Sequence, residues 1–398
     1  MRPAIRRPYF PALLLVAATG ALSTDTYVAA LPRLAADLGV SSSVAQLTMT
    51  ACIAGMAVGQ LMGGSWSDAR GRRGLIVTSS IAFAALSIVC AVATSAWLLI
   101  IARLFQGIAC GVGAAVGRAV VTDVWFGREA AARFGTLTAV GLIAPVAGPA
   151  IGGALLTFGD WRTVFWFLVL LGVVMVIGAT TGIPETLLKE RRHPGGFASL
   201  VARARDLLTD RAFVVPVIVQ CFTTGGFFVY IGGSSFVLQE DLGISQQLYS
   251  VVFAVNAVAM MISSILFRLL VGRFGAFALR RLAIGVQSLA VAALLTVTLI
   301  SPGHQPPLAA VWTCLGVMTF GLGTYLPSNS SITQEAGRRS AGTASALGGG
   351  IPFLVGACTT PLTGLIGSET VLVMASLMAA LFACAILAAI MGARTRRG

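Results

Sequence analysis

Twelve long apolar runs constrain the fold of this chain more than any other feature of its sequence. Each run holds about 20 residues, the length at which an α-helix crosses the hydrocarbon core of a bilayer. The runs are continuous and do not alternate, which excludes a membrane β-barrel. We therefore expect an all-α membrane protein with twelve transmembrane helices. The predicted spans cover residues 11–31, 44–64, 75–94, 97–121, 134–158, 163–183, 212–238, 248–267, 282–300, 308–327, 341–366 and 370–391.

Composition and charge agree with a membrane protein. Hydrophobic residues make up 57% of the 398 residues and charged residues 10%, whereas soluble domains carry about 25% charged residues. A net charge of +13 would indicate a nucleic-acid partner in a soluble protein, but here the basic residues divide by side of the membrane. With the N-terminus inside, 23 of the 27 fall in inner segments, and only Arg33 and Arg162 in outer ones. The positive-inside rule then places both termini in the cytoplasm, and we expect no nucleic-acid partner.

The predicted domain boundaries come from the N-terminal segment and from the loop after the sixth span. Three arginines among the first seven residues precede an apolar run, a pattern shared with secretory signal peptides. We expect no cleavage, because the run is long enough to span and its loss would leave an odd number of helices. The longest polar loop follows the sixth span. We expect a six-helix domain over 1–183, a cytoplasmic linker over 184–211 and a second six-helix domain over 212–398.

An internal repeat supports this division. Five residues of the fifth span recur in the eleventh at one common offset of 207 residues. They are Gly135, Thr136, Ala139, Gly141 and Pro145, matched by Gly342, Thr343, Ala346, Gly348 and Pro352. Parallel repeats of this kind occur in transporters that bind their substrate near the membrane midplane, between the repeats.

Asp25 is the only one of the 14 acidic residues that falls within a predicted span. A carboxylate at such depth costs about 2.5–3.5 kcal/mol, so it is rarely retained without a partner or a function. It is either a structural residue paired to a neighbour or a site that binds a proton or a cation.

Arg103, in the fourth span, lies at a similar depth to Asp25. Each is six residues from the outer end of its span, or about 9 Å along the helix axis. Arg103 either acts on Asp25, directly or through water, or only bonds backbone carbonyls. A nearby cation favours the ionised carboxylate and burial favours the neutral one, so their balance would set the proton affinity.

The loop between spans 2 and 3 carries an acid, a turn glycine and an arginine, namely Asp68, Gly71 and Arg72. Asp68 can cap a helix or pair with an arginine of a neighbouring helix, which would make a latch that opens with the cytoplasmic side. Arg118, near the inner end of the fourth span, can attract anionic groups, stabilise the turn at Asp123 or extend its charge to the membrane surface. We predict that these five residues act in gating.

The fifth span contains a run of small residues and prolines, from Gly141 to Gly153, that includes Pro145, Gly148 and Pro149. Prolines kink a helix and small residues let another backbone approach closely, as two rocking domains need at their interface. We expect these three residues to act in gating as well. Ordinary small-residue packing is the alternative.

The seventh span is rich in aromatic residues and glycines, and its rings either line a pocket for flat apolar compounds or face lipid. Uncharged polar side chains such as Gln220 and Asn256 are candidates for hydrogen bonds to a substrate. The candidate substrate contacts are Tyr27, Gln106, Cys110, Gln220, Phe228, Tyr230 and Asn256.

The sequence shows no sign of disulfides, a metal site, an enzyme active site or an ATP-binding motif. All seven cysteines fall in predicted spans and both histidines in loops, so neither a disulfide framework nor a metal motif is indicated. The spans hold no cluster of a nucleophile and a base, and no GxxxxGK[ST] run occurs. We therefore expect neither an enzyme nor an ATP-driven pump, and no cofactor or metal.

Three of these motifs resemble the major facilitator superfamily. Residues 64–73 resemble its loop between helices 2 and 3, although Ala69 replaces a basic residue. Residues 103–107 resemble the intramembrane arginine motif of proton-coupled members, and residues 141–153 are similar to the glycine-proline motif of the antiporters.

Finer marks are similar to the bicyclomycin and chloramphenicol resistance branch of bacterial drug:proton antiporters. These are Asp25-Thr26-Tyr27 followed by Leu31-Pro32, Gly159-Asp160-Trp161-Arg162, and Pro184-Glu185-Thr186-Leu187. The resemblance implies a transporter of two six-helix domains in the bacterial cytoplasmic membrane. It would export hydrophobic drug-like compounds of the chloramphenicol or bicyclomycin type in exchange for protons.

The proton site implied by this resemblance is Asp25, with Arg103. Some relatives carry a second acid two turns earlier, where this chain has Ala17 and Ala18, so we expect one proton per cycle. We expect a monomer whose partners are the small substrate, protons and lipid. A proton-coupled uptake symporter of the same fold, for a small organic solute, is the alternative.

Overall fold

The computed structural model describes residues 7–125, 127–187, 192, 204–337, 341–366 and 369–394. Within these ranges the regular structure is helical, without strands. The chain forms two compact units: unit 1 combines Met1–Tyr27 with Ala51–Val201, and unit 2 combines Val28–Thr50 with Ala202–Gly398. The boundary near residue 201 falls in the predicted linker 184–211, most of which lies outside the described residues. The division into two six-helix domains stays a prediction.

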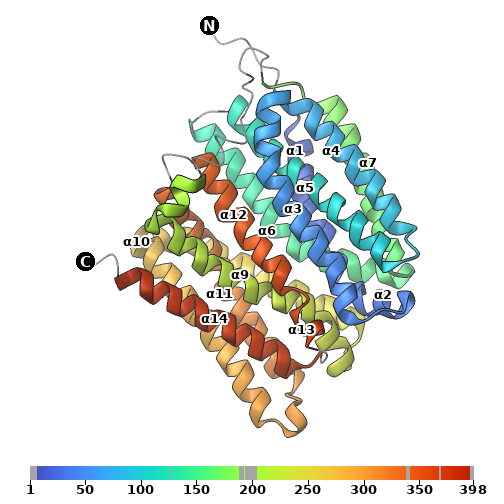
Figure 1. Cartoon of the computed structure of the whole chain (residues 1–398), viewed down its shortest axis with the longest axis vertical. Helices are drawn as coiled ribbons and strands as arrows, with labels where there is room; N and C mark the ends of the chain where they lie inside the picture. The colour runs from blue at the N-terminus through green and yellow to red at the C-terminus, as the bar shows by residue number, and fades with distance from the viewer. Residues whose placement is uncertain are drawn as a thin grey trace. The chain divides into compact units, whose positions relative to one another are not determined.

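Unit 1 is built from helices that pack in pairs. α4 packs against both α5 and α7, and α1 packs against α6 (Figure 1). Side-chain oxygens of Ser95 and Asp160 accept hydrogen bonds from the free amide groups at the starts of α5 and α7. The helices are α1 (Phe10–Asp25), α3 (Ser42–Arg70, which enters unit 1 at Ala51), α4 (Arg72–Ala91), α5 (Ala96–Val124), α6 (Gly127–Phe158) and α7 (Trp161–Gly182).

Unit 2 contains the remaining helices. α9 packs against α12 and α14, and α10 packs along α11 (Figure 1). The elements are η1 (Val28–Ala30), α2 (Leu31–Leu38), α9 (Arg211–Phe236), η3 (Val237–Asp241), α10 (Gln246–Ile300), η4 (Pro302–His304), α11 (Leu308–Ala336), α12 (Ala341–Thr359), α13 (Leu362–Leu365) and α14 (Val371–Arg394).

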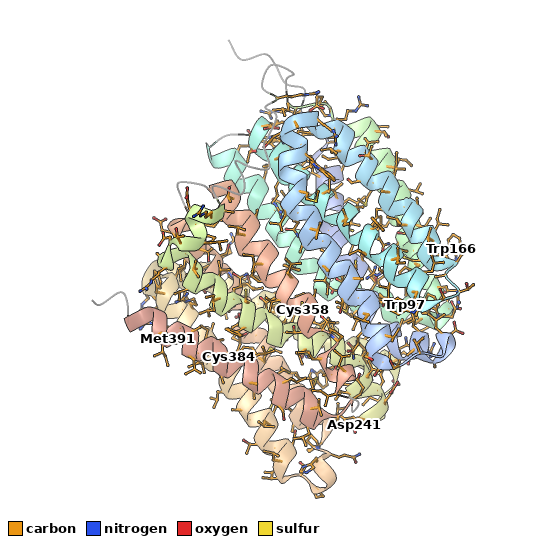
Figure 2. The ribbon with its side chains drawn as sticks, in the orientation of Figure 1. Trp97, Trp166, Asp241, Cys358, Cys384 and Met391 are labelled. Carbon is orange, nitrogen blue, oxygen red and sulfur yellow. The ribbon has the colours of Figure 1, made fainter. Side chains whose placement is uncertain are left out.

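The helix lengths confirm an all-α protein with many membrane spans. Among the described residues, ten helices are long and apolar enough to cross a bilayer. α10 holds two of the predicted spans, because Gly275 breaks it with φ 76° and ψ 156°, and α6 covers the predicted fifth span. Large apolar side chains point outward from the helices, such as Trp97, Trp166 and Met391 in Figure 2, which are 67%, 50% and 69% exposed. Such surface suits lipid better than water.

The first span differs from the single helix predicted over 11–31. α1 ends at Asp25, a 3₁₀ turn follows at Val28–Ala30, and α2 begins at Leu31. Pro32 explains part of this break, because proline lacks the amide hydrogen that a continuous helix would donate to Val28 and its ring would press on that carbonyl. The break coincides with the division between the two units, which falls after Tyr27.

Glycines let α3 and α5 approach each other closely within unit 1. A Cβ added at Gly55 or Gly59 of α3 would collide with the backbone of α5, and one added at Gly107 or Gly111 of α5 would collide with the backbone of α3. Both pairs have the four-residue spacing that brings small residues onto one helix face. This contact anchors the middle of α5 and begins one turn after Arg103.

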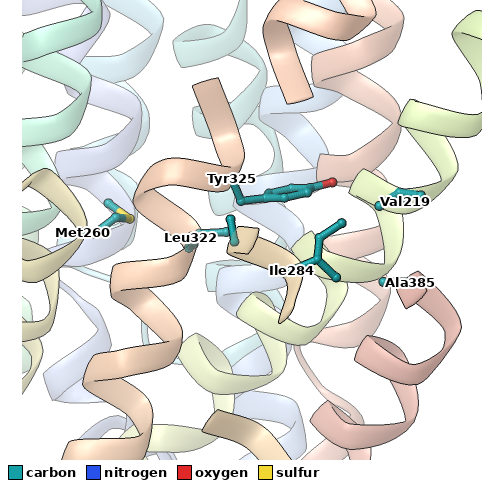
Figure 3. Packing of buried hydrophobic residues seen from close by; sticks show 7 residues of the cluster. Val219, Met260, Ile284, Leu322, Tyr325 and Ala385 are labelled. Atoms are coloured by element: carbon teal, nitrogen blue, oxygen red, sulfur yellow. The ribbon is translucent and has the colours of Figure 1, made fainter. Parts of the chain in front are cut away.

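The core of unit 2 joins four helices. Its side chains interlock at one level of the bundle, with the Tyr325 ring lying across it (Figure 3). The cluster consists of Val219 from α9, Met260, Ala283 and Ile284 from α10, Leu322 and Tyr325 from α11, and Ala385 from α14.

Candidate functional site

Asp25 is the last residue of α1 and is 7% exposed. Its carboxylate accepts one hydrogen bond, from the Thr24 hydroxyl at 3.1 Å. The C-terminal end of a helix carries a partial negative charge, so an ionised Asp25 would sit, nearly unsolvated, at the unfavourable end of α1. A proton on the carboxyl removes that cost.

The glycine-proline run of α6 packs directly against this end of α1. A Cβ at Gly148 would lie 2.7 Å from the Cβ of Asp25, and one at Gly152 would collide with the carbonyl oxygen of Thr26. Pro149 is buried beside them, while the side chain of Pro145 lies outside the described residues. Only glycine at positions 148 and 152 lets the two backbones come this close.

Arg103 is fully buried in unit 1 and binds the preceding turn of α1. Its Nη1 donates to the Ser23 hydroxyl and to Gln106 Oε1, both at 2.7 Å, and its Nη2 donates to the Ser23 carbonyl at 3.1 Å. The guanidinium also lies over the rings of Tyr27 and Phe165, 5.1 and 5.7 Å from their centroids.

The predicted direct contact between Arg103 and Asp25 is not present. Arg103 instead bonds a backbone carbonyl, that of Ser23. An influence of Arg103 on Asp25 through water stays a prediction. A cation this deeply buried is stabilised here by neutral dipoles and aromatic faces. Arg103 therefore fixes the backbone two residues before Asp25, and in the described part of the chain the carboxyl makes no ion pair.

The first-half candidates for substrate contact are all buried. Gln106 links Arg103 to the Ser87 hydroxyl of α4 at 2.7 Å. The Tyr27 ring packs at a tilt against Phe165 with centroids 5.1 Å apart, and Cys110 is 3% exposed. Tyr27 and Gln106 thus help to hold Arg103. Contact of any of these three with a substrate stays a prediction.

The structure brings the predicted gating residues Asp68, Arg72 and Asp123 together. Arg72 Nη1 donates to Asp68 at 2.7 Å and Arg72 Nε donates to Asp123 at 2.9 Å, with the guanidinium 7% exposed. Arg72 also binds the Ser67 hydroxyl, and the Thr186 hydroxyl donates to Asp123 at 3.1 Å. One arginine thus joins α3, α4 and α5 at the end of unit 1 that the basic residues predict to be cytoplasmic.

Gly71 makes the turn into this cluster, with φ 98° and ψ 166°, a conformation open essentially to glycine. A Cβ at Gly71 would lie 2.5 Å from Glu185 Oε2. Glu185 in turn accepts from the amides of Arg72 at 2.8 Å and Arg73 at 3.3 Å. The glycine is therefore required both by its backbone angles and by the carboxylate that caps α4.

Arg118 does not reach Asp123, one of the partners considered for it. Its Nη2 donates instead to Gln60 Oε1 of α3 at 3.2 Å. No acidic side chain pairs with Arg118 among the described residues. Its role in gating stays a prediction.

In unit 2, two of the candidates form one hydrogen-bonded chain with a tryptophan. Trp312 Nε1 donates to Asn256 Oδ1 at 3.1 Å, and Asn256 Nδ2 donates to the Tyr230 hydroxyl at 3.2 Å. Tyr230 stacks on Phe253, with centroids 5.7 Å apart. A cavity of about 350 Å³ lies beside Asn256 and Trp312, between α10 and α11. The sequence indicated Tyr230 and Asn256 but not their connection.

The other two candidates of unit 2 lie elsewhere. Gln220 Oε1 accepts from Asn329 Nδ2 at 2.8 Å, and Asn329 also accepts from the buried Arg280 at 3.3 Å. Phe228 packs edge-on against Phe353, with ring centroids 5.7 Å apart, and is 6% exposed. Phe228 thus faces protein and not lipid.

The comparison with known proteins decides the family. Residues 13–361 match the Major Facilitator Superfamily. The chain belongs to the Major Facilitator Superfamily. Members of this superfamily are transporters and not enzymes, so the chain is a multi-pass membrane transporter, as its motifs led us to expect.

Relatives within the superfamily are bacterial. The "Uncharacterized MFS-type transporter YdgK" of Bacillus subtilis is 35% identical over 92% of this chain and 90% of that protein. The "Bicyclomycin resistance protein homolog" of Haemophilus influenzae is 29% identical over 92% and 90%. The "Multidrug resistance protein MdtL" of Escherichia coli O157:H7 is 28% identical over 76% and 75%.

Solved structures show the same superfamily fold. A POT family transporter in complex with 5-aminolevulinic acid superposes with a TM-score of 0.74 over 97% of this chain and 95% of that one, at 13% identity. The nucleoside transporter NupG gives a TM-score of 0.72 over 97% and 99%, at 9% identity. At such low identity these matches concern the fold alone.

Several site residues of this superfamily member were not singled out from the sequence. Glu185 caps α4, and its only signal was its place in the run from Pro184 to Leu187. Ser23 holds Arg103 and gave no signal beyond its closeness to Asp25. Arg280 was counted among the cytoplasmic charges but is 8% exposed, because the helix after Gly275 carries it inward.

Proposed function

We propose that this transporter exports hydrophobic drug-like compounds, of the chloramphenicol or bicyclomycin type, in exchange for protons across the bacterial cytoplasmic membrane. The observation that carries the proposal is the setting of Asp25. It is a buried carboxyl at the broken end of α1, packed on Gly148 of α6, and no described residue forms an ion pair with it. The names of two relatives, a bicyclomycin resistance homolog and a multidrug resistance protein, support the substrate class.

In this mechanism Asp25 binds a proton from the outer side and releases it to the cytoplasm, one per cycle. Ionisation of a poorly solvated carboxyl at the end of α1 is unfavourable, so the charged form favours a state in which water reaches it. Because Gly148 and Gly152 touch Asp25 and Thr26, any movement of this turn shifts α1 against α6. Arg103 is the positioning residue that holds the turn through Ser23.

The remaining roles follow the same proposal. Asp68, Gly71, Arg72 and Asp123 form the inner latch of unit 1, and Arg118, Pro145, Gly148 and Pro149 take part in gating. Substrate contacts come from Gln220, Phe228, Tyr230 and Asn256 of unit 2, and from Tyr27, Gln106 and Cys110 of unit 1. The transporter acts as a monomer with both termini in the cytoplasm.

Flux in inside-out membrane vesicles tests the proposal. An acidic lumen corresponds to an acidic outer side, so we expect the wild type to accumulate radiolabelled chloramphenicol when the lumen is acidic. Asp25→Asn should lower this accumulation to the level of vesicles without the transporter, because the amide cannot carry a proton. Asp160→Asn, at an exposed helix cap, is the matched control and should retain it.

The alternatives give different results in the same vesicles. An uptake symporter would move the compound out of the acidic lumen. Full proton-driven accumulation by Asp25→Asn would refute the role of Asp25, and the absence of any flux in the wild type would refute the substrate class.

A further inference from the structure

The segment Val28–Thr50, here called the outer hairpin, contacts helices of unit 2. It comprises η1, α2 and the first turns of α3. The Ala29 carbonyl accepts hydrogen bonds from Gln246 Nε2 at 3.2 Å and from Gln239 Nε2 at 3.4 Å. Ala29 is 1% exposed and only four residues from Asp25. The outer hairpin thus binds α10 and η3 within unit 2.

A second contact of the outer hairpin ends on a carboxyl group. Gln46 of α3, which is fully buried, donates from Nε2 to Glu369 Oε1 at 2.9 Å and to the Thr363 hydroxyl at 3.2 Å. Close by, a Cβ at Gly364 would lie 2.7 Å from the backbone of Ser43. Glu369 lies between α13 and α14, on the outer side in the topology that the basic residues predict.

Glu369 is held in this contact by neutral donors only. Its Oε1 faces Gln46, while its Oε2 is buried and has no hydrogen-bond partner among the described residues. The charged group that acts on Glu369 is the carboxylate of Glu240, in η3. Its neighbour Asp241 (labelled in Figure 2) accepts from the amide of Val371 at the start of α14. Among the described residues no basic side chain pairs with Glu369 from α3, η3, α13 or α14.

We propose that Glu369 is a second proton-binding site, on the outer side, and that its proton holds the outer hairpin against α13 and α14. A neutral carboxyl can remain in this contact, with Gln46 as its donor. A carboxylate has one buried oxygen without a donor and an acid as its neighbour, which favours release of the hairpin into water. The proposal goes beyond the proposed function, since it holds for whatever solute is carried.

The direction of the pH effect follows from the same contacts. Burial raises the pKa of Glu369, the neighbouring polar side chains of Ser42, Thr363 and Gln46 oppose the rise, and the charge of Glu240 adds to it. When the hairpin leaves, the carboxyl is hydrated and its pKa returns to the ordinary value, about 4.3. Docking is therefore most stable below this ordinary value. It weakens by up to about tenfold per pH unit until the raised value is passed, and is constant above it.

Cysteine labelling measures docking directly. Ser43→Cys places a thiol on the hairpin where docking packs it against Gly364 of α13, and Ser41→Cys places one on exposed surface two residues away. Cells are treated with a membrane-impermeant maleimide at different outer pH values, and the labelled peptide is quantified by mass spectrometry. The ratio of the two labelling rates cancels the intrinsic pH dependence of thiol reactivity. We expect this ratio to be low in acid and to rise as the outer pH rises.

Two further substitutions separate the proposal from a purely structural role. Glu369→Gln cannot ionise and should keep the ratio low at every pH. Glu240→Gln removes the neighbouring charge and should shift the rise to lower pH without abolishing it. A flat ratio in the otherwise unchanged protein, or an unaltered pH dependence in Glu369→Gln, would overturn the proposal. Because Glu240→Gln leaves Gln46, Thr363 and Glu369 in place, its shift tests the idea even if Glu369→Gln fails to fold.

Discussion

Asp25 and Arg103 divide the work of the candidate proton site between them. The carboxyl has one hydroxyl donor, from Thr24, and a glycine of α6 against its Cβ. The guanidinium binds both the side chain and the backbone of Ser23. The cation thus holds the position of the turn, and in the proposed mechanism the carboxyl carries the proton.

The shape of the Arg103 side chain should therefore matter as much as its charge. Arg103→Lys keeps the charge but loses the planar guanidinium, which binds Ser23 and Gln106 at once and lies over the rings of Tyr27 and Phe165. We expect a lower melting temperature in detergent and at least about a tenfold loss in transport rate, equivalent to about 1.4 kcal/mol. Arg162→Lys is the control, because the guanidinium of Arg162 pairs with the exposed Asp160 at 3.3 Å. Equal transport by the two variants would show that charge alone suffices.

Among the helices, the contact between α1 and α6 is the one on which the proposed coupling depends. On one side is the C-terminal end of α1, and on the other are Gly148 and Gly152 of α6. The run from Gly141 to Gly153 therefore acts through its smallest residues, which touch Asp25 and Thr26.

Gly148→Ala tests this contact. The added Cβ would lie 2.7 Å from the Cβ of Asp25, so α1 and α6 must separate, and overpacking of this kind costs about 1–3 kcal/mol. We expect a lower melting temperature and reduced proton-driven transport. Gly64→Ala, where a Cβ in α3 meets nothing within 4 Å, should be tolerated. If Gly148→Ala behaves like Gly64→Ala, the close approach is not needed for transport.

For the whole molecule, two equivalent turns support an origin by duplication. Gly71 joins α3 to α4, and Gly275 joins the two parts of α10, with φ/ψ of 98°/166° and 76°/156°. The acid and arginine of the first turn, Asp68 and Arg72, have no counterpart at the second, which reads Gly272-Arg273-Phe274-Gly275. The backbone of the loop is therefore shared, and the charged latch belongs to unit 1 alone.

The distribution of basic residues predicts the orientation of the whole chain. His304, exposed in η4, should lie on the outer side, and the C-terminus should lie in the cytoplasm. We expect His304→Cys to react with an impermeant maleimide in intact cells, and a C-terminal green fluorescent protein fusion to fluoresce. Labelling of His304→Cys only after the cells are permeabilised would reverse the orientation.

Much of the fold could be predicted from the sequence because crossing a bilayer is a local property of about 20 residues. The twelve apolar runs and the glycine-proline run were readable in this way, as was Asp25 as a lone acid. The superfamily match confirms the fold that these motifs indicated. The break after Asp25 was missed, although Pro32 gives part of the signal for it.

What only the tertiary structure decided is which groups meet. Counting residues along the two predicted helices placed Arg103 at the depth of Asp25. In the structure the side chain of Arg103 points to Ser23 instead, because its direction depends on how each helix is rotated about its axis. The outer hairpin follows unit 2 although it is continuous with helices of unit 1, and a glutamine 323 positions away faces Glu369. Partners of this kind depend on packing between distant segments, and no local pattern of apolar and polar residues encodes them.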